Sequence, residues 1–368
     1  MDANSLCSGR DGLLRAKLLA RNLLICAEPN SQLLSSGGRE GTGTDRGSEP
    51  SKINEVPIVS IEMTRRTLLK GSSTLAFASG AAHSGFAASD APAGDPTAGR
   101  SLVFDESFRA LDPAIWDAGP KATTASQGHY GRAALSRMDG EEGYNPYAIV
   151  DDPAAEDGKA LQITAKYIGR PMAVRNYYGN TLPEFQWISG NIQTARSDGT
   201  VYRGWRNGYF EARMWFPYHP LTWPAFWLLN KNSILKPAAS VEVDIVEHKG
   251  WERDIYGTYL HEWGKPDERH DSTGVYPGVD LTGGYFRYGF LIDGERCAPY
   301  FERKLIRDAN TGRPANWTLG RAKQFDAEND IFFPLLTLAL RTDVPFPNPL
   351  RPEDREARLR IDYMRVYQ

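Results

Sequence analysis

Three carboxylates stand close together in the stretch VEVDIVEH, which runs from residue 241 to 248. Side chains alternate between the two faces of a regular strand, so Glu242 and Asp244 share one face and Glu247 points to the other. Paired carboxylates on a wet face are the groups that hydrolyse glycosidic bonds, one as acid and base and one as nucleophile. A solvated acidic face, or a set of oxygen ligands for calcium, would have the same composition.

A single extra residue would bring the third carboxylate to the first two. Val241, Val243 and Ile245 form the apolar face of the expected strand. A β-bulge inserts one residue into a strand and re-aims the side chains beyond it. We therefore predict a bulge near residues 245–246 that returns Glu247 to the acidic face. Asp244 would then either hydrogen-bond Glu242 or share a proton with it, as close carboxylates do.

The elements that position these groups are predicted to be strands. From about residue 100 onward, short runs such as GYFEARMWF, IYGTYLHEW and LRIDYMRVY alternate in polarity or carry β-branched and aromatic residues. Clusters of Gly, Pro, Asn and Asp separate them, and no long helical period is present. The pattern predicts one all-β domain, a jelly-roll β-sandwich with a concave substrate cleft.

The bulk composition excludes some function classes. The 368 residues carry a net charge of −3, so no basic balance indicates a nucleic-acid partner. No run of about 18 or more apolar residues indicates a membrane span. Cys297 is the one cysteine outside the first 30 residues, which leaves no partner for a disulfide once a leader is removed. We expect a monomer that binds neither nucleic acid nor, after processing, a membrane.

The first part of the chain resembles a leader rather than a fold. Residues 1–62 are rich in Gly, Ser and charge, which predicts a disordered or mis-called extension. Residues 63–88 have a charged start with TRRTLLK, a modest apolar run and small residues near the end. This layout predicts a twin-arginine export signal, with an arginine-tipped amphipathic helix as the alternative. Residues 89–99 would be a linker and residues 100–368 the catalytic domain.

Four separated stretches resemble glycoside hydrolase family 16. EVDIVE is similar to the bulged active-site signature of its laminarinase-like members. LVFDESFRALDPAIW resembles the opening strand, SGNIQT with NGYFEARMWFP and WPAFWLLN resembles the strands before the active site, and LRIDYMRVYQ resembles the closing strand. The resemblance implies a concanavalin A-like fold. It also implies Glu242 as nucleophile, Glu247 as acid and base, and Asp244 as the carboxylate between them.

The resemblance also gives candidates for substrate binding. Trp227 matches a tryptophan beside the cleaved sugar, and Trp223 and Trp263 are further candidates, with core packing as the alternative. His261 would bond an active-site carboxylate, contact sugar or be structural. Arg213 would either pair with Glu211 or reach substrate.

The resemblance implies an exported, endo-acting, retaining hydrolase of a β-linked polysaccharide, with β-1,3- or mixed-linkage glucan favoured. A transglycosylase and a non-catalytic carbohydrate-binding β-sandwich are the alternatives. Val241 replaces the glycine that laminarinase-like members carry before the nucleophile, so glucan specificity does not follow directly. No cofactor is required. The resemblance allows a structural calcium ion on the convex face at Asp362, but we interpret Asp362 as a plain surface aspartate and predict no metal ligand.

Overall fold

A computed structural model describes residues 94–118, 129–130, 133–135, 144–172, 185–196, 198–236, 239–264, 268–320, 329–341, 344–345 and 349–368. The chain divides into two compact units, Met1–Ala81 and Ala82–Gln368, and all described residues belong to the second. The expected extension over residues 1–62 and the export signal over residues 63–88 lie outside the described residues, as does the first half of the expected linker.

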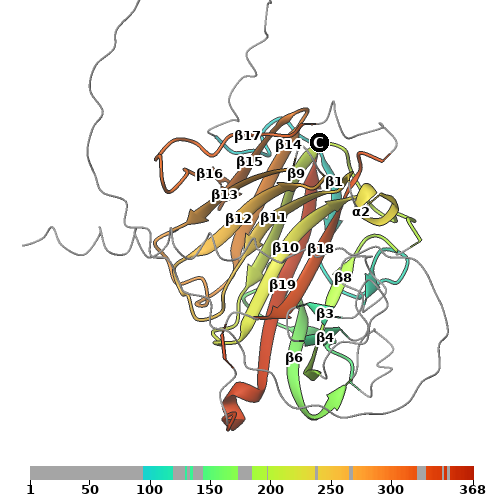
Figure 1. Ribbon diagram of the computed structural model, residues 1–368, viewed down its shortest axis with the longest axis vertical. Helices are drawn as coiled ribbons and strands as arrows, with labels where there is room; N and C mark the ends of the chain where they lie inside the picture. The colour runs from blue at the N-terminus through green and yellow to red at the C-terminus, as the bar shows by residue number, and fades with distance from the viewer. Residues whose placement is uncertain are drawn as a thin grey trace, which may run out of the picture. The chain divides into compact units, whose positions relative to one another are not determined.

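Two sheets build the described part of the second unit, as the strand pattern predicts (Figure 1). Nearly all neighbouring strands are antiparallel, and the exception is the pairing of β4 with β7. The first sheet has 12 strands: β1 (Leu102–Glu106), β3 (His129–Tyr130), β4 (Ala133–Leu135), β5 (Tyr147–Asp151), β6 (Lys159–Met172), β7 (Phe185–Ser189), β9 (Gly208–Trp215), β14 (Phe286–Asp293), β15 (Arg296–Phe301), β16 (Lys304–Leu305), β17 (Trp317–Thr318) and β19 (Glu356–Tyr367).

The second sheet carries the acidic stretch. Its seven strands follow the order β13-β12-β11-β10-β18-β8-β2, so the acidic strand lies near one edge with two strands beyond it. The strands are β2 (Asp117–Ala118), β8 (Asn191–Gln193), β10 (Thr222–Asn230), β11 (Val241–Glu247), β12 (Tyr256–Glu262), β13 (Arg269–Val275) and β18 (Phe332–Leu340). The two sheets curl into the jelly-roll β-sandwich that the sequence predicts.

The main core lies between the two sheets. Alternate residues of β9, namely Phe210, Ala212 and Met214, meet alternate residues of β11 and β18 there. Stacked sheets bury one face of each strand in this way, because the side chains stand about perpendicular to the sheet. A separate small cluster on the other face of the seven-stranded sheet contains Trp227, Leu229, Phe333 and Leu335. This second cluster places the acidic face beside an apolar floor.

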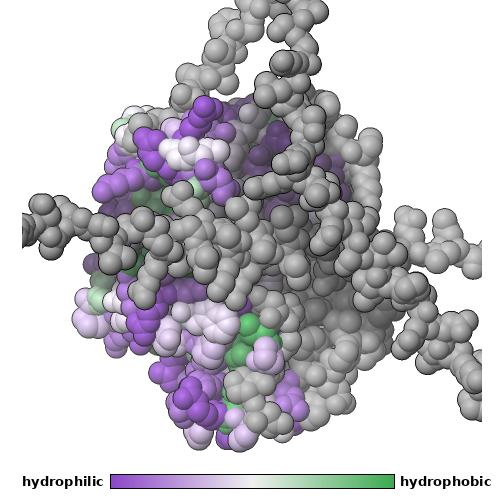
Figure 2. Space-filling view, turned by 60° about the vertical axis from the view of Figure 1, so that its left-hand side comes forward, coloured by the Kyte–Doolittle hydropathy of each residue, from purple (hydrophilic) through white to green (hydrophobic). Residues whose placement is uncertain are grey.

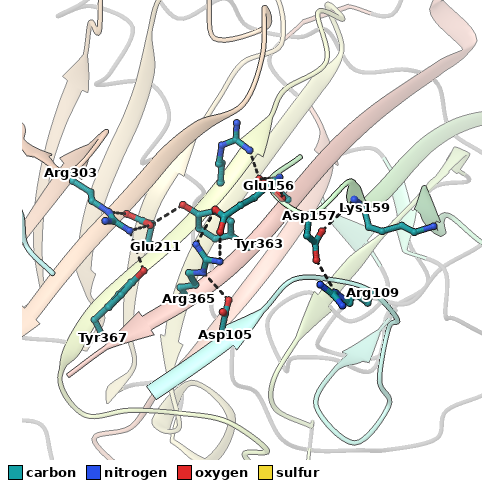
Figure 3. A network of polar contacts seen from close by, with 12 residues as sticks. Asp105, Arg109, Glu156, Asp157, Lys159, Glu211, Arg303, Tyr363, Arg365 and Tyr367 are labelled. Carbon is teal, nitrogen blue, oxygen red and sulfur yellow. Dashed lines mark hydrogen bonds and ion pairs between the residues drawn. The ribbon is translucent and has the colours of Figure 1, made fainter. Parts of the chain in front are cut away.

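Charged residues cover the outer face of the 12-stranded sheet (Figure 3). The fully buried Glu211 accepts two hydrogen bonds from Arg303 and a third from the Tyr363 hydroxyl. Arg365 bonds both Asp105 and Glu156, and so ties the opening strand and the loop before β6 to the closing strand. A buried carboxylate is tolerable only when it is paired and hydrogen-bonded, and Glu211 is both.

A tight turn of two non-glycine residues joins β15 to β16. Glu302 and Arg303 both have positive φ, at 49° and 60°, a region that ordinary residues rarely adopt. Ion pairs on either side hold them: Glu302 accepts two hydrogen bonds from the Arg287 guanidinium, and Arg303 binds Glu211. The stretch YFER therefore makes this turn without a glycine.

Helices are few among the described residues. These are one short α-helix, α2 (Asn232–Leu235), and one 3-10 helix, η2 (Pro352–Arg355). Within the ranges that the structure covers, no helix is long and apolar enough to cross a membrane. Figure 2 shows a surface on which most of the described residues are hydrophilic, with isolated hydrophobic ones between them.

Candidate active site

The predicted β-bulge is present in β11. Between Asp244 and Glu247 the strand advances three residues while its partner β12 advances two, from Tyr259 to Gly257. On the other side, Val246 pairs with Phe226 and Asp244 pairs with Trp227. Ile245 is therefore the residue that has no pairing partner in β10. Ile245 and Val246 are both buried in the main core. Two successive side chains thus point inward, and Glu247 returns to the face of Glu242 and Asp244, as predicted.

The strand register arranges this face in three rows, because directly opposed residues in a sheet share a face. One row contains Leu229, Glu242, His261 and His270, in the order β10, β11, β12, β13. The next contains Trp227, Asp244, Tyr259 and Ser272, and the third contains Ala225, Glu247, Gly257 and Gly274. Each carboxylate therefore has its own neighbours, and these set the charge that it carries.

Glu242 is held by an indole. The Trp263 Nε1–H donates a hydrogen bond to Glu242 Oε2 over 2.9 Å. Trp263 follows the end of β12 and stacks on His261, with ring centroids 5.1 Å apart. Sequence reasoning named Trp263 for sugar contact, whereas the structure has it orient a carboxylate. A hydrogen bond to the charged form favours ionisation.

Asp244 is nearly buried and lies against a histidine. His261 Nε2 is 3.3 Å from Asp244 Oδ2, which is one of the three roles expected for this residue. The backbone carbonyl of Asp244 accepts a hydrogen bond from the Thr258 hydroxyl at 2.9 Å, beside the bulge. Asp244 is thus fixed through both its side chain and its backbone.

All three carboxyl groups have raised pKa values. Burial, and then the neighbouring Asp244, raises the pKa of Glu242 to about 7, while the two histidines and the Trp263 hydrogen bond act against this rise. Burial raises the pKa of Asp244 to about 7 as well. Burial and the charges of Asp244 and Glu242 raise the pKa of Glu247 well above its usual range. Glu242 has an N–H donor and Glu247 is under the charge of both neighbours, so Glu247 is the one that retains its proton.

The aromatic floor beside the carboxylates comes from β10. Trp227, 6% exposed, lies directly opposite Asp244 and donates its Nε1–H to the Thr337 hydroxyl at 2.9 Å. Thr337 in turn donates to Asn191 Oδ1 at 2.5 Å. Trp223 lies on the same face of the same strand, four residues earlier, as the sequence spacing predicts. Trp205, in contrast, packs against Phe104 and Phe210 at the main core.

Tyr259 and Gly257 were not identified from the sequence. Gly257 is directly opposite Glu247, and a Cβ at this position would collide with the ring of Tyr259. The ring therefore lies over the glycine, next to the position of Glu247. Only strand pairing reveals this, because YGTYLHE by itself reads as an ordinary alternating strand.

No protein-family model matches the chain, but curated relatives do. It is 30% identical over 171 residues to the endo-1,3-1,4-beta-glycanase EglC of Rhizobium meliloti, a match that covers 46% of the chain and 32% of the relative. It is 25% identical over 280 residues to the endo-1,3-1,4-beta-glycanase ExsH of the same organism, covering 73% of the chain and 51% of the relative. The chain thus spans about a third to a half of the length of these two relatives.

Solved structures share the fold. A laminarinase from Flavobacterium sp. UMI-01 superposes with a TM-score of 0.50 at 21% identity, covering 73% of this chain and 100% of that one. The LamA catalytic domain from Zobellia galactanivorans superposes with a TM-score of 0.53 at 19% identity, covering 74% and 100%.

The similarity to these relatives and the shared fold agree with the resemblance of the acidic stretch to laminarinase-like members of glycoside hydrolase family 16. The glycine that such members carry before the nucleophile is here Val241, whose side chain is fully buried in the main core. Its backbone N–H donates to Asn230 Oδ1 at 3.0 Å, which fixes the start of the acidic strand against β10.

Arg213 does not lie with the three carboxylates of β11. It belongs to β9 and points to the outer face of the 12-stranded sheet, where its Nη1 binds the Asp362 carboxylate. It does not pair with Glu211, which is bound by Arg303. Two-residue spacing correctly placed Arg213 and Glu211 on one face, but the sequence could not tell which of the two faces is buried against the other sheet.

The surroundings of Asp362 do not suit the calcium ion that the family allows. Arg213 Nη1 contacts both the Asp362 carboxylate and, at 3.3 Å, the Ala154 carbonyl oxygen. The Glu156 N–H donates to both Asp362 oxygens, at 3.0 and 3.1 Å. A guanidinium and an N–H group thus bond to the oxygens that a calcium ion would need.

The raised pKa values predict that neutralising Glu242 stabilises the protein at high pH. A carboxyl whose pKa is higher in the folded state than in the unfolded state binds more protons when folded, so unfolding becomes easier as pH rises between the two values. For Glu242 that window runs from its ordinary value of 4.5 to about 7. We expect Glu242→Gln to raise the free energy of unfolding by about 1 kcal/mol or more at pH 8 and far less at pH 4. Thermal melts of both proteins at the two pH values test this, and an equal difference at both pH values would contradict it.

Proposed function

We propose that this chain is an endo-acting retaining hydrolase of β-1,3- or mixed-linkage glucan. The observation that carries the proposal is the bulge in β11, which places Glu242, Asp244 and Glu247 on one face in adjacent rows. A carbohydrate-binding sandwich has no use for three close carboxylates, because they repel one another and raise the pKa of each member.

In the first step, ionised Glu242 attacks the anomeric carbon of the bound sugar. Trp263 holds Oε2, so Oε1 is the oxygen that forms the new bond. As the bond from the anomeric carbon to the leaving oxygen breaks, Glu247 gives that oxygen its proton. The raised pKa of Glu247 keeps the proton available at neutral pH.

In the second step, the charge change at Glu242 alters what Glu247 does. Once Glu242 is an ester it carries no negative charge, and one of the causes that raise the pKa of Glu247 is gone. Glu247 then takes a proton from water while the water oxygen attacks the anomeric carbon and Glu242 leaves as a carboxylate. Two inversions return the original configuration.

Three relatives support the substrate. EglC and ExsH are named as endo-1,3-1,4-beta-glycanases, and a relative from Cryptopygus antarcticus, 32% identical over 123 residues that cover 32% of this chain and 42% of the relative, is named a glucan endo-1,3-beta-glucosidase. Trp227 supplies an indole face at the row of Asp244, against which the C–H face of a glucosyl ring can pack.

Product analysis tests the proposal directly. The protein is incubated with laminarin, mixed-linkage β-glucan, a galactan and a bacterial exopolysaccharide, and products are followed by chromatography and by proton NMR of the new reducing ends. We expect oligosaccharides of intermediate size from a β-glucan, first seen as the β-anomer. Longer chains at the expense of acceptors would indicate a transglycosylase, and binding without products would indicate a binding module.

We further propose that turnover needs no metal ion. Asp362, which stands where some family members hold a calcium ion, is paired with Arg213. We expect EDTA to leave the rate of glucan hydrolysis and the melting temperature unchanged, and added calcium to change neither. A calcium-dependent rise in melting temperature would contradict this.

Export and a monomeric state are also proposals. The paired Arg65 and Arg66 of TRRTLLK support a twin-arginine signal. Replacing both by lysine should retain the protein in the cytoplasm, because that pathway reads the arginine pair rather than positive charge alone.

Sedimentation of the processed protein tests the expected monomer.

A further inference from the structure

A relay of four polar side chains, Asp244, His261, His270 and Glu268, leads from the active site to the surface. His261 Nε2 is 3.3 Å from Asp244 Oδ2. On its other side, His261 Nδ1 is 2.7 Å from His270 Nδ1. His270 Nε2 is in turn 2.9 Å from Glu268 Oε1. His261 has a side chain that is 13% exposed, while His270 and Glu268 are 32% and 31% exposed.

The strand register and ring stacking hold this relay of side chains in place. His261 and His270 are directly opposed on β12 and β13, in the row of Glu242. The indole of Trp263 lies against both imidazoles, with ring centroids 5.1 and 5.0 Å away. The same indole donates to Glu242, so the histidine pair and the carboxylate share one support.

The number of protons that the relay needs determines the charge that it carries. Its three contacts each need one hydrogen, because a hydrogen bond has one donor and one acceptor. Two neutral imidazoles supply two hydrogens, so one contact would bring two lone pairs together. A third proton completes all three contacts and gives either one imidazolium or a protonated Asp244. Glu268, as a carboxylate at one end, favours a positive charge on the pair.

We propose that His261 and His270, anchored by Glu268, store one proton beside Glu242 and Asp244 and thereby set the lower pH limit of catalysis. The proposal rests on the proposed function. His270 and Glu268 act as positioning residues, since they reach the reacting groups only through His261.

Among the residues that the structure describes, the other charged groups near the pair lie on the two faces of the sheet. On the same face are Glu242, Asp244 and Glu247 of β11, Tyr259 of β12 and Lys249 after β11. The opposite face of β12 and β13 carries Glu262, Asp271 and Arg269, and Arg269 binds both acids, at 2.9 and 3.4 Å. Leu229 continues the row on β10 and carries no charge. Positive charge on the histidine pair therefore acts chiefly on Glu242 and Asp244.

The sign of the effect follows from electrostatics. A nearby cation favours an ionised carboxylate, and both histidines lower the pKa of Glu242 against the effects that raise it. The nucleophile must be ionised to attack. Loss of the stored proton therefore moves the acid limb of the pH profile to higher pH.

The first test is His270→Leu, which removes the contact at His261 Nδ1, so that a neutral His261 satisfies the remaining contact with Asp244 and no additional proton is needed. We expect the acid limb of kcat/KM on the hydrolysed β-glucan to move up by about half a pH unit or more, with the plateau rate changed by less than about threefold. Asp271→Asn is the matched control, since it is the next residue of β13 and faces the other way; its profile should match the wild type. A His270→Leu profile that superimposes on the wild type would overturn the proposal.

A second readout needs no turnover. Nitrogen-15 NMR follows the protonation of both imidazoles in the folded protein, and Glu268→Gln should lower the pH at which the pair loses its proton, because an anion that favours the imidazolium is gone. Unchanged imidazole titrations in Glu268→Gln would overturn the proposal even if His270→Leu fails to fold. If the wild type cleaves no β-glucan, the proposed function fails, while this measurement still decides whether the pair stores a proton.

Discussion

Replacing Glu242 by glutamine should lower the rate of β-glucan hydrolysis on the order of 10⁴-fold or more, with the fold intact. An amide oxygen cannot form the covalent bond to the anomeric carbon that double displacement needs. Glutamine is nearly the same shape and can still accept the Trp263 N–H bond, so the site keeps its geometry. Binding of the substrate should therefore persist while turnover is lost.

The measurement is kcat on the hydrolysed glucan, together with binding by calorimetry and a thermal melt. Glu295→Gln is the control for the chemical change itself, because Glu295 lies exposed in the turn between β14 and β15. Near-normal turnover in Glu242→Gln would show that another residue is the nucleophile. Loss of both turnover and the cooperative melt would show that Glu242 is needed for the fold.

Replacing Glu247 by alanine should separate the two tasks of this residue. For the natural glucan, whose leaving oxygen needs a proton, we expect a loss of roughly 10²–10⁴-fold. For a dinitrophenyl β-glycoside of a short glucan, formation of the covalent intermediate should be slowed far less, because its leaving group departs without protonation. Breakdown of that intermediate should then limit the rate, because no base activates water.

Azide completes this test. It is a small nucleophile that needs no general base, so it should restore turnover of the activated substrate and give a β-glycosyl azide. The same addition should leave the wild type unchanged. An α-azide, or equal losses on both substrates with no effect of azide, would remove Glu247 from the acid and base role.

The sequence by itself determined the fold class and the acidic group. Alternating short strands can bury their apolar faces only against another sheet, so a β-sandwich followed from pattern alone. The three-residue step from Asp244 to Glu247, with Ile245 and Val246 both apolar, required a bulge if the acids were to meet. Both inferences depend on the alternation of polar and apolar residues within individual strands, and this alternation is visible in the sequence.

Only the tertiary structure decided which distant residues meet those acids. The pairing of β11 with β12, and of β12 with β13, brings Trp263, His261, His270 and Glu268 to Glu242 and Asp244. Arg213 was a substrate-binding candidate, and its strand was predicted correctly. That strand belongs to the 12-stranded sheet, however, and not to the sheet that carries the three carboxylates. Strand register and the choice of sheet arise from long-range packing, and a one-residue change of register would exchange every neighbour without altering the pattern of any single strand.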